Sequence, residues 1–226
     1  MRQVLFRDDD LGWSHPLFLR LLALFRHHGQ KLNAAAIPTL CAAGEAPWAP
    51  GFDPKAAAPV LQVVTHGFSH RAHQTKPKKT EYPAGRCLSE VERELTEALV
   101  LTRKRFGDLY FPAFVPPWNR FAEEFLPLLK TAGYQILSRA GVPAGGGPSE
   151  LNVSLDLHTE KAGPWRDPAR ILAEIDRQLA ERPIMGIMLH HGRMTEADFA
   201  VLSQVLSDLP LRAVKTGFFS DYAQDL

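Results

Sequence analysis

The pattern that most constrains the fold is an alternation of short apolar stretches with longer segments of helical periodicity. Strand-length stretches are followed by segments with apolar residues three and four positions apart, about seven times along the chain. The predicted strands are 2–6, 32–38, 60–65, 110–115, 134–138, 151–155, 184–189 and 211–215, and the predicted helices are 16–29, 89–105, 121–132, 168–180 and 196–207. We expect long loops over 40–58 and 71–86. This alternation predicts a parallel α/β architecture in a single domain over residues 1–226.

Composition and charge exclude several classes of protein. The chain has 226 residues, with 26 basic and 25 acidic side chains and a formal net charge of +1. This balance argues against nucleic acid or an anionic membrane surface as a partner. The sequence contains no apolar run of ~20 residues, and charged residues follow Met1 too closely for a signal peptide. Cys41 and Cys87 do not form a Cys-x-x-Cys pair. We therefore expect a cytoplasmic protein without disulfides.

Polar clusters follow four of the predicted strands. They are Asp8–Asp10, His66–His70, Trp118-Asn119 and His190-His191. In a (β/α) barrel, the carboxyl ends of the strands meet on one face, where active sites lie. A random scatter of histidine and aspartate would not respect strand ends, so this coincidence favours an enzyme.

The residue types in these clusters indicate a metal-dependent hydrolase. His66 and His70 directly follow a strand, and two imidazoles with one carboxylate form a common hydrolytic metal site that leaves room for water. Asp9 and Asp10 point in different directions as neighbours, so one can bind the metal while the other acts as a base. The alternatives are a pair of surface histidines and a solvated acidic turn before Trp13.

A proton donor and substrate-binding residues are predicted nearby. His190 and His191 end an apolar strand, where a histidine can protonate a leaving amine. Since adjacent side chains on a strand point to opposite faces, we expect one of the two to face the site. The candidates for contact with a sugar are His73, Trp118, Asn119, Arg120, His158 and Trp165. The alternatives are that Trp118 is a core residue in a turn, and that the histidines form their hydrogen bonds within loops and have no role in catalysis.

Taken together, the motifs resemble those of the NodB-type polysaccharide deacetylases, carbohydrate esterase family four. The segment 6–12 (Phe-Arg-Asp-Asp-Asp-Leu-Gly) resembles the first motif of the family, 66–70 (His-Gly-Phe-Ser-His) the second, Pro117-Trp118 the end of the third, and 189–191 (Leu-His-His) the fifth. With 78–81 (Lys-Lys-Thr-Glu), the set is more similar still to an uncharacterised bacterial branch. The resemblance spans residue 6 to about 205. It implies a distorted (β/α)7 barrel that removes an N-acetyl group from an amino sugar or polysaccharide.

The resemblance also implies roles for individual residues. The ligands of a divalent metal, usually zinc with cobalt, nickel or iron as alternatives, would be Asp10, His66 and His70. Asp9 would be the general base and His190 or His191 the general acid. His73 is expected near the site without binding the metal.

Two positions depart from the family pattern. The arginine that orients the base in the family falls on Val115, and Arg7 or Arg120 are the candidates to replace it. The family tyrosine is Trp118 here, although its backbone N–H could still stabilise an oxyanion.

Three other functions stay open at this stage. A YdjC-like sugar deacetylase shares the Asp-Asp-x-Gly start at 9–12. An iron oxygenase also uses two histidines and a carboxylate, although the α/β alternation argues against its usual jelly roll. A sugar-binding module with a dead site would need neither Asp9 nor the late histidine. The acyl sugar and the oligomeric state are not determined by the sequence.

Overall fold

A curled parallel sheet forms the centre of the molecule. The computed structural model describes residues 2–41, 52–141, 143, 145–158 and 167–223. The strands are β1 (Arg2–Leu11), β2 (Leu32–Ala36), β3 (Leu61–His66), β4 (Tyr110–Val115), β5 (Ile136–Leu137), β6 (Ser149–Glu150), β7 (Val153–Asp156), β8 (Ile184–Leu189) and β9 (Val214–Thr216). Their order is β6-β5-β4-β3-β2-β1-β8-β7, with β9 beside β1, and every pairing is parallel. The α/β distorted-barrel prediction is confirmed.

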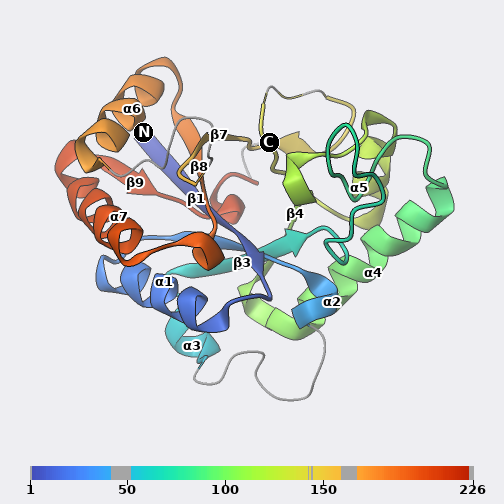
Figure 1. Cartoon of the computed structure of the whole chain (residues 1–226), viewed down its shortest axis with the longest axis horizontal. Coiled ribbons are helices and arrows are strands. Elements are labelled where there is room, and N and C mark those ends of the chain that lie inside the picture. Colours follow the sequence, from blue (N-terminus) through green and yellow to red (C-terminus); the bar gives the residue numbers. More distant parts are fainter. Residues whose placement is uncertain (1, 42–51, 142, 144, 159–166, 224–226) are drawn as a thin grey trace.

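Helices cover the outer face of this sheet. They are α1 (His15–His27), α2 (Pro38–Cys41), α3 (Pro54–Ala57), α4 (Leu88–Phe106), α5 (Leu126–Ala132), α6 (Pro168–Glu181) and α7 (Glu196–Asp208). Figure 1 shows α1, α6 and α7 gathered on the left of the view and α4 and α5 on the right. Local signals fix their starts: Asp167 accepts the Ala169 N–H at the N-terminus of α6, and Thr195 forms a capping box with Asp198 in α7. None of the described helices is long and apolar enough to cross a membrane.

Alternate residues of β1 pack into two different hydrophobic cores, one on each face of the sheet. Val4 and Phe6 belong to the large outer cluster, where α1 contributes Phe18 and Phe25. Leu5 faces the interior of the barrel, in a smaller cluster with Ala35, Val64, Ala113, Val115, Ile136, Phe219 and Tyr222. Because the side chains of a strand alternate between its faces, Arg7 and Asp9 continue the interior face while Asp8 continues the outer one.

Several element boundaries differ from the sequence prediction. Strand β1 continues through the three aspartates to Leu11, so these carboxylates lie within the strand rather than after it. The segment predicted as a loop over 40–58 includes α3, and the predicted helix 121–132 becomes regular only from Leu126. The predicted strand 134–138 is reduced to β5, β6 was not predicted, and residues 210–212 form a 3₁₀ turn before β9.

Candidate metal centre and active site

Three consecutive aspartates in β1 point in three directions. The pairing of β1 with β2 shifts register between Asp8 and Leu11, which marks an irregularity in the strand. Asp10 sits there with φ of 71°, a left-handed backbone conformation that is uncommon outside glycine. The irregularity turns the Asp10 carboxylate away from the alternation followed by Asp8 and Asp9. Strain of this kind gathers at functional sites.

Asp10 lies against the two histidines that the sequence predicts as metal ligands. Its Oδ1 is 3.3 Å from His66 Nε2 and 3.1 Å from His70 Nε2. Ligand atoms ~2.1 Å from a zinc ion and separated by 90–109° lie ~3.0–3.4 Å apart, so the Asp10 oxygen already has ligand spacing from each of the two imidazole nitrogens. The three side chains fit a divalent metal in both residue type and geometry.

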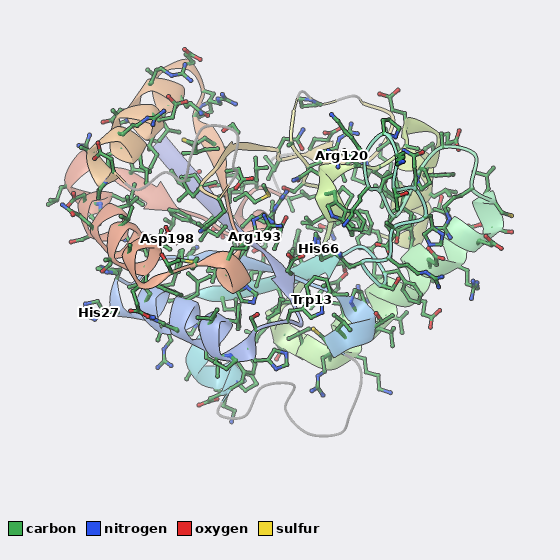
Figure 2. All side chains as sticks on the ribbon, in the orientation of Figure 1. Trp13, His27, His66, Arg120, Arg193 and Asp198 are labelled. Carbon is green, nitrogen blue, oxygen red and sulfur yellow. The ribbon has the colours of Figure 1, made fainter. Side chains whose placement is uncertain are left out.

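Neighbouring groups fix the two imidazoles. His66 ends β3, and its Nδ1 lies 3.0 Å from the Val115 carbonyl oxygen. Since a carbonyl only accepts, Nδ1 carries a proton and Nε2 is left to face the metal position, as in many metal sites. His70 is flanked by Trp13 and Trp118, with ring centroids 5.0 and 4.4 Å away. Figure 2 shows Trp13 and His66 near the centre of the molecule, with Arg120 and Arg193 nearby.

The electrostatics of the cluster favour a cation. Burial raises the pKa of Asp10, but hydrogen bonds and charges from His66 and His70 outweigh it, and the pKa lies far below its usual value. Burial lowers the pKa of His66, yet its bond to Asp10 and the nearby carboxylate charges leave that pKa raised. Both shifts show that the surroundings stabilise an ionised Asp10 carboxylate next to positive charge, and a divalent ion would supply that charge.

Asp9 is held on the interior face by a fully buried arginine. Its two carboxylate oxygens accept bonds from Arg7 Nε at 2.8 Å and Nη2 at 2.9 Å. Arg7 also donates to Ser138 and, at 2.7 Å, to Asn119 Oδ1. This network fixes the Asp9 carboxylate next to the metal cluster.

The two late histidines occupy very different surroundings. The ring of His191 is fully buried, with Nδ1 2.7 Å from Asp8 Oδ2 and Nε2 2.8 Å from the Trp13 carbonyl oxygen. Burial lowers its pKa, but Asp8 and the Trp13 carbonyl raise it to about 9. Since the carbonyl only accepts and Asp8 is paired with the other nitrogen, the protons of His191 are committed to the fold. His190 lines the open cavity instead.

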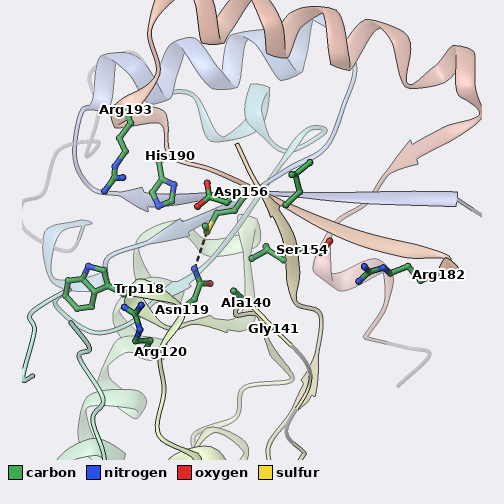
Figure 3. A pocket seen from close by; sticks show the side chains of 13 residues that line it. Trp118, Asn119, Arg120, Ala140, Gly141, Ser154, Asp156, Arg182, His190 and Arg193 are labelled. Atoms are coloured by element: carbon green, nitrogen blue, oxygen red, sulfur yellow. Dashed lines mark hydrogen bonds between the residues drawn. The ribbon is translucent and has the colours of Figure 1, made fainter. Parts of the chain in front are cut away.

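A cavity of about 720 Å³ opens beside this cluster. Figure 3 shows its lining, with Trp118, Asn119 and Arg120 on one side and Asp156, His190 and Arg193 on the other. Trp118 connects the cavity to the metal cluster, because it contacts His70. Trp118 and Asn119 both have left-handed φ angles, 57° and 58°, in the tight turn after β4.

Two of the remaining predicted contact residues, His73 and His158, do not line the main cavity. His73 is exposed, and within the described chain no metal cluster contains it. His158 lines a separate small cavity with Leu189 and Met194 rather than the main one, and burial together with the charge of His190 lowers its pKa. Trp165 lies outside the described residues.

Comparison with known proteins places the fold. No family model and no curated protein matches the chain. Among solved structures, a protein from Mycobacterium smegmatis assigned to the polysaccharide deacetylases is 15% identical to this chain. The alignment covers 99% of this chain and 89% of that one, with a TM-score of 0.69. A family 4 acetyl xylan esterase from Clostridium thermocellum, in complex with cobalt, is 12% identical over 97% and 89% of the two chains, with a TM-score of 0.61.

The fold is that of the polysaccharide deacetylases. A CE4 family pseudoenzyme from Bacillus anthracis shares it as well, at 13% identity over 98% of this chain and 65% of that one, with a TM-score of 0.64. Identities this low establish the deacetylase fold alone, and an inactive protein has the same fold. The function therefore has to be argued from the site residues.

Of the two candidates to replace the arginine that the resemblance expects at Val115, Arg7 is the one that contacts Asp9. Val115 is apolar and ends β4, whereas Arg7 contacts both oxygens of Asp9 from within β1. The other candidate, Arg120, donates to the Lys79 carbonyl oxygen at 3.0 Å instead. Strand alternation contained this signal, since residues two apart on β1 share a face.

Sequence reasoning gave no role to Glu81, which holds the loop between the two candidate histidine ligands. Its buried carboxylate accepts bonds from the Phe68 N–H at 3.2 Å, the Ser69 N–H at 2.8 Å and the Ser69 hydroxyl at 3.0 Å. Gly67 allows this approach, since a Cβ there would lie 2.1 Å from Glu81 Oε2. The only hint in the sequence was Glu81 within the resembling segment 78–81.

Proposed function

We propose that this chain is a divalent-metal-dependent hydrolase that removes an N-acyl group, acetyl above all, from an amino sugar or polysaccharide. The observation that carries the proposal is the placement of Asp9 beside Asp10, His66 and His70. Three ligands set for one ion next to a carboxylate held by a buried arginine are the parts that amide hydrolysis needs. A binding module would need only the aromatic and polar walls of the cavity.

Each group in the site would have a separate task. When bound to Asp10, His66 and His70, the ion lowers the pKa of water to ~7 and polarises the amide carbonyl. Asp9 takes a proton from the attacking water as the oxygen adds to the carbonyl carbon. Arg7 keeps the Asp9 carboxylate aimed, because it donates a hydrogen bond to each of its two oxygens.

Completion of the reaction requires a proton donor and an oxyanion donor. As the C–N bond breaks, His190 donates a proton to the leaving amine, and the products are acetate and the free amino sugar. His190 is preferred over His191 because it lines the cavity while His191 is buried between Asp8 and Trp13. The backbone N–H of Trp118 is the candidate donor to the oxyanion.

Zinc is the metal that we propose, on the basis of donor type. Two imidazoles and one carboxylate suit zinc and its neighbours in the first transition row better than magnesium or calcium, which prefer oxygen. The parallel α/β barrel is not the jelly roll in which an iron facial triad usually occurs. These points support a hydrolytic ion over an oxygenase.

The test is release of acetate from a panel of N-acetylated sugars and chito-oligosaccharides. We expect acetate from at least one class of substrate, its loss after treatment with a chelator, and its recovery when zinc or cobalt is added back. A chain that binds these sugars but releases no acetate with any of the metals would support the dead sugar-binding module instead.

A further inference from the structure

A second cluster of side chains that could hold a metal ion reaches the cavity wall opposite Trp118 through Asp156 and His190, with His158 behind that wall. Asp156 ends β7, His158 follows it by two residues, and His190 follows β8. One potential ligand atom from each of the three lies within 4.8 Å of the others. The strands β7 and β8 are paired, with Asp156 opposite Met188, so the fold itself brings the three together.

Two atoms of this cluster lack the partners that buried polar atoms normally have. The Nδ1 atoms of His158 and His190 are both buried, and neither has a hydrogen-bond partner among the described residues. Buried polar atoms without a partner are rare, and an unseen ion or water is a common reason. The two rings stand edge to face with centroids 6.3 Å apart, and neither Nδ1 forms a hydrogen bond to the other ring.

The carboxylate is already fixed in place. Asp156 Oδ1 accepts the backbone N–H of His158 at 2.9 Å, which ties the acid to the turn that carries the histidine. Asp156 and His190 line the main cavity, and Figure 3 shows both side chains there. A cation between them would be reached from solvent through that cavity, with room for water as a further ligand.

We infer that Asp156, His158 and His190 form a second, weaker site for a divalent transition-metal ion of the zinc type. The donor set is two imidazoles and one carboxylate, which excludes magnesium and calcium as preferred ions. We expect the site to be weaker than the first, because its ligand atoms lie within 4.8 Å of one another without a carboxylate–imidazole pair at ion-pair distance among these three described residues. In the first cluster, Asp10 Oδ1 already lies 3.3 and 3.1 Å from the two imidazole nitrogens.

Occupancy of this site would inhibit the proposed reaction. A metal ion on His190 takes the lone pair that would carry the acidic proton, so the leaving amine loses its donor. Low zinc would then activate the chain through Asp10, His66 and His70, and excess zinc would inhibit it through His190. This consequence rests on the proposed function, whereas the number of bound ions does not.

The experiment is a zinc titration of the metal-free full chain, read as metal content after equilibrium dialysis. We expect two equivalents in the unaltered chain, bound with different affinities. H158A should lose the weaker equivalent or bind it at least ~10-fold less tightly, and D156N should weaken the same equivalent. D10N should lose the tighter equivalent and keep the weaker one.

A matched control removes an unrelated histidine. His27 is exposed at the end of α1, far from the cavity (Figure 2), and H27A should still bind two equivalents. Circular dichroism checks that each variant folds. If H158A does not fold, D156N is the variant that tests the second site. Saturation of the unaltered chain at one equivalent, or two unchanged equivalents in H158A, would overturn the second site. If no sugar released acetate, the proposed function would be contradicted. The number of bound zinc ions would still decide whether the second metal site exists.

Discussion

At the scale of single residues, three neighbouring aspartates meet separate partners because the backbone turns their carboxylates in different directions. Asp8 faces the outer core and pairs with His191, Asp9 faces the barrel interior and pairs with Arg7, and Asp10 leaves the strand alternation at φ of 71°. Residue type alone could not distinguish them. The local irregularity of β1 decides which carboxylate meets which partner.

The Asp8–His191 pair predicts a specific dependence of stability on pH. The pKa of His191 is raised to about 9 in the folded chain, against ~6.5 when unfolded. The protonated His191 therefore contributes fully to the free energy of unfolding below pH ~6.5. This contribution, of order 3 kcal/mol, is lost as the pH rises to about 9. We expect the difference in free energy of unfolding between the unaltered chain and H191Q to shrink over this range. Denaturant titrations at several pH values measure it, and a constant difference would contradict the charged pair.

At the scale of elements, the loop after β3 is shaped by one buried carboxylate. Glu81 accepts two backbone N–H groups and a hydroxyl from residues 68 and 69, between the two histidine ligands. Partners of this kind orient metal ligands and tune metal affinity. The sequence pattern predicted both histidines but not Glu81. The contact of Glu81 with residues 68 and 69 joins positions more than ten residues apart, which a local pattern does not indicate.

Two glycines with the same backbone conformation test that loop. Gly67 and Gly29 have φ of 61° and 62°, so alanine at either position costs ~1–2 kcal/mol in backbone strain. Only at Gly67 would the added Cβ meet other groups, the Glu81 carboxylate at 2.1 Å and the Pro117 ring at 2.6 Å, while at Gly29 nothing lies within 4 Å. We expect G67A to lower zinc affinity by about 10–100-fold, and G29A to leave it unchanged. Equal zinc affinity in the two variants would show that Glu81 does not organise the ligands.

At the scale of the whole molecule, the parallel strands bring distant parts of the sequence to one edge. Asp10 comes from β1, His66 from β3, Asn119 from the turn after β4, and His190 from the end of β8. Parallel sheets place such positions on the same face, which is why strand ends in the sequence predicted the site. The outer core and the smaller interior core support this arrangement from both sides of β1.

What the sequence could not predict depends on tertiary contacts. Aspartate is a poor strand former, yet β1 continues through three of them because Arg7 and His191 pair with their carboxylates. Periodicity cannot indicate such partners. The short strands β5 and β6 carry too little pattern to recognise, and the choice between Arg7 and Arg120 required the hydrogen bonds themselves.

The central claim is that Asp10 holds a metal while Asp9 acts as a base, and two near-isosteric variants test it. D9N keeps all three ligands, so metal content should stay at the unaltered level at the first site while acetate release falls by ~10²–10⁴-fold. D10N removes a ligand, so the tight metal and the turnover should both be lost. Measuring metal content and acetate release on both variants decides the assignment. Loss of the tight metal in D9N with its retention in D10N would contradict it.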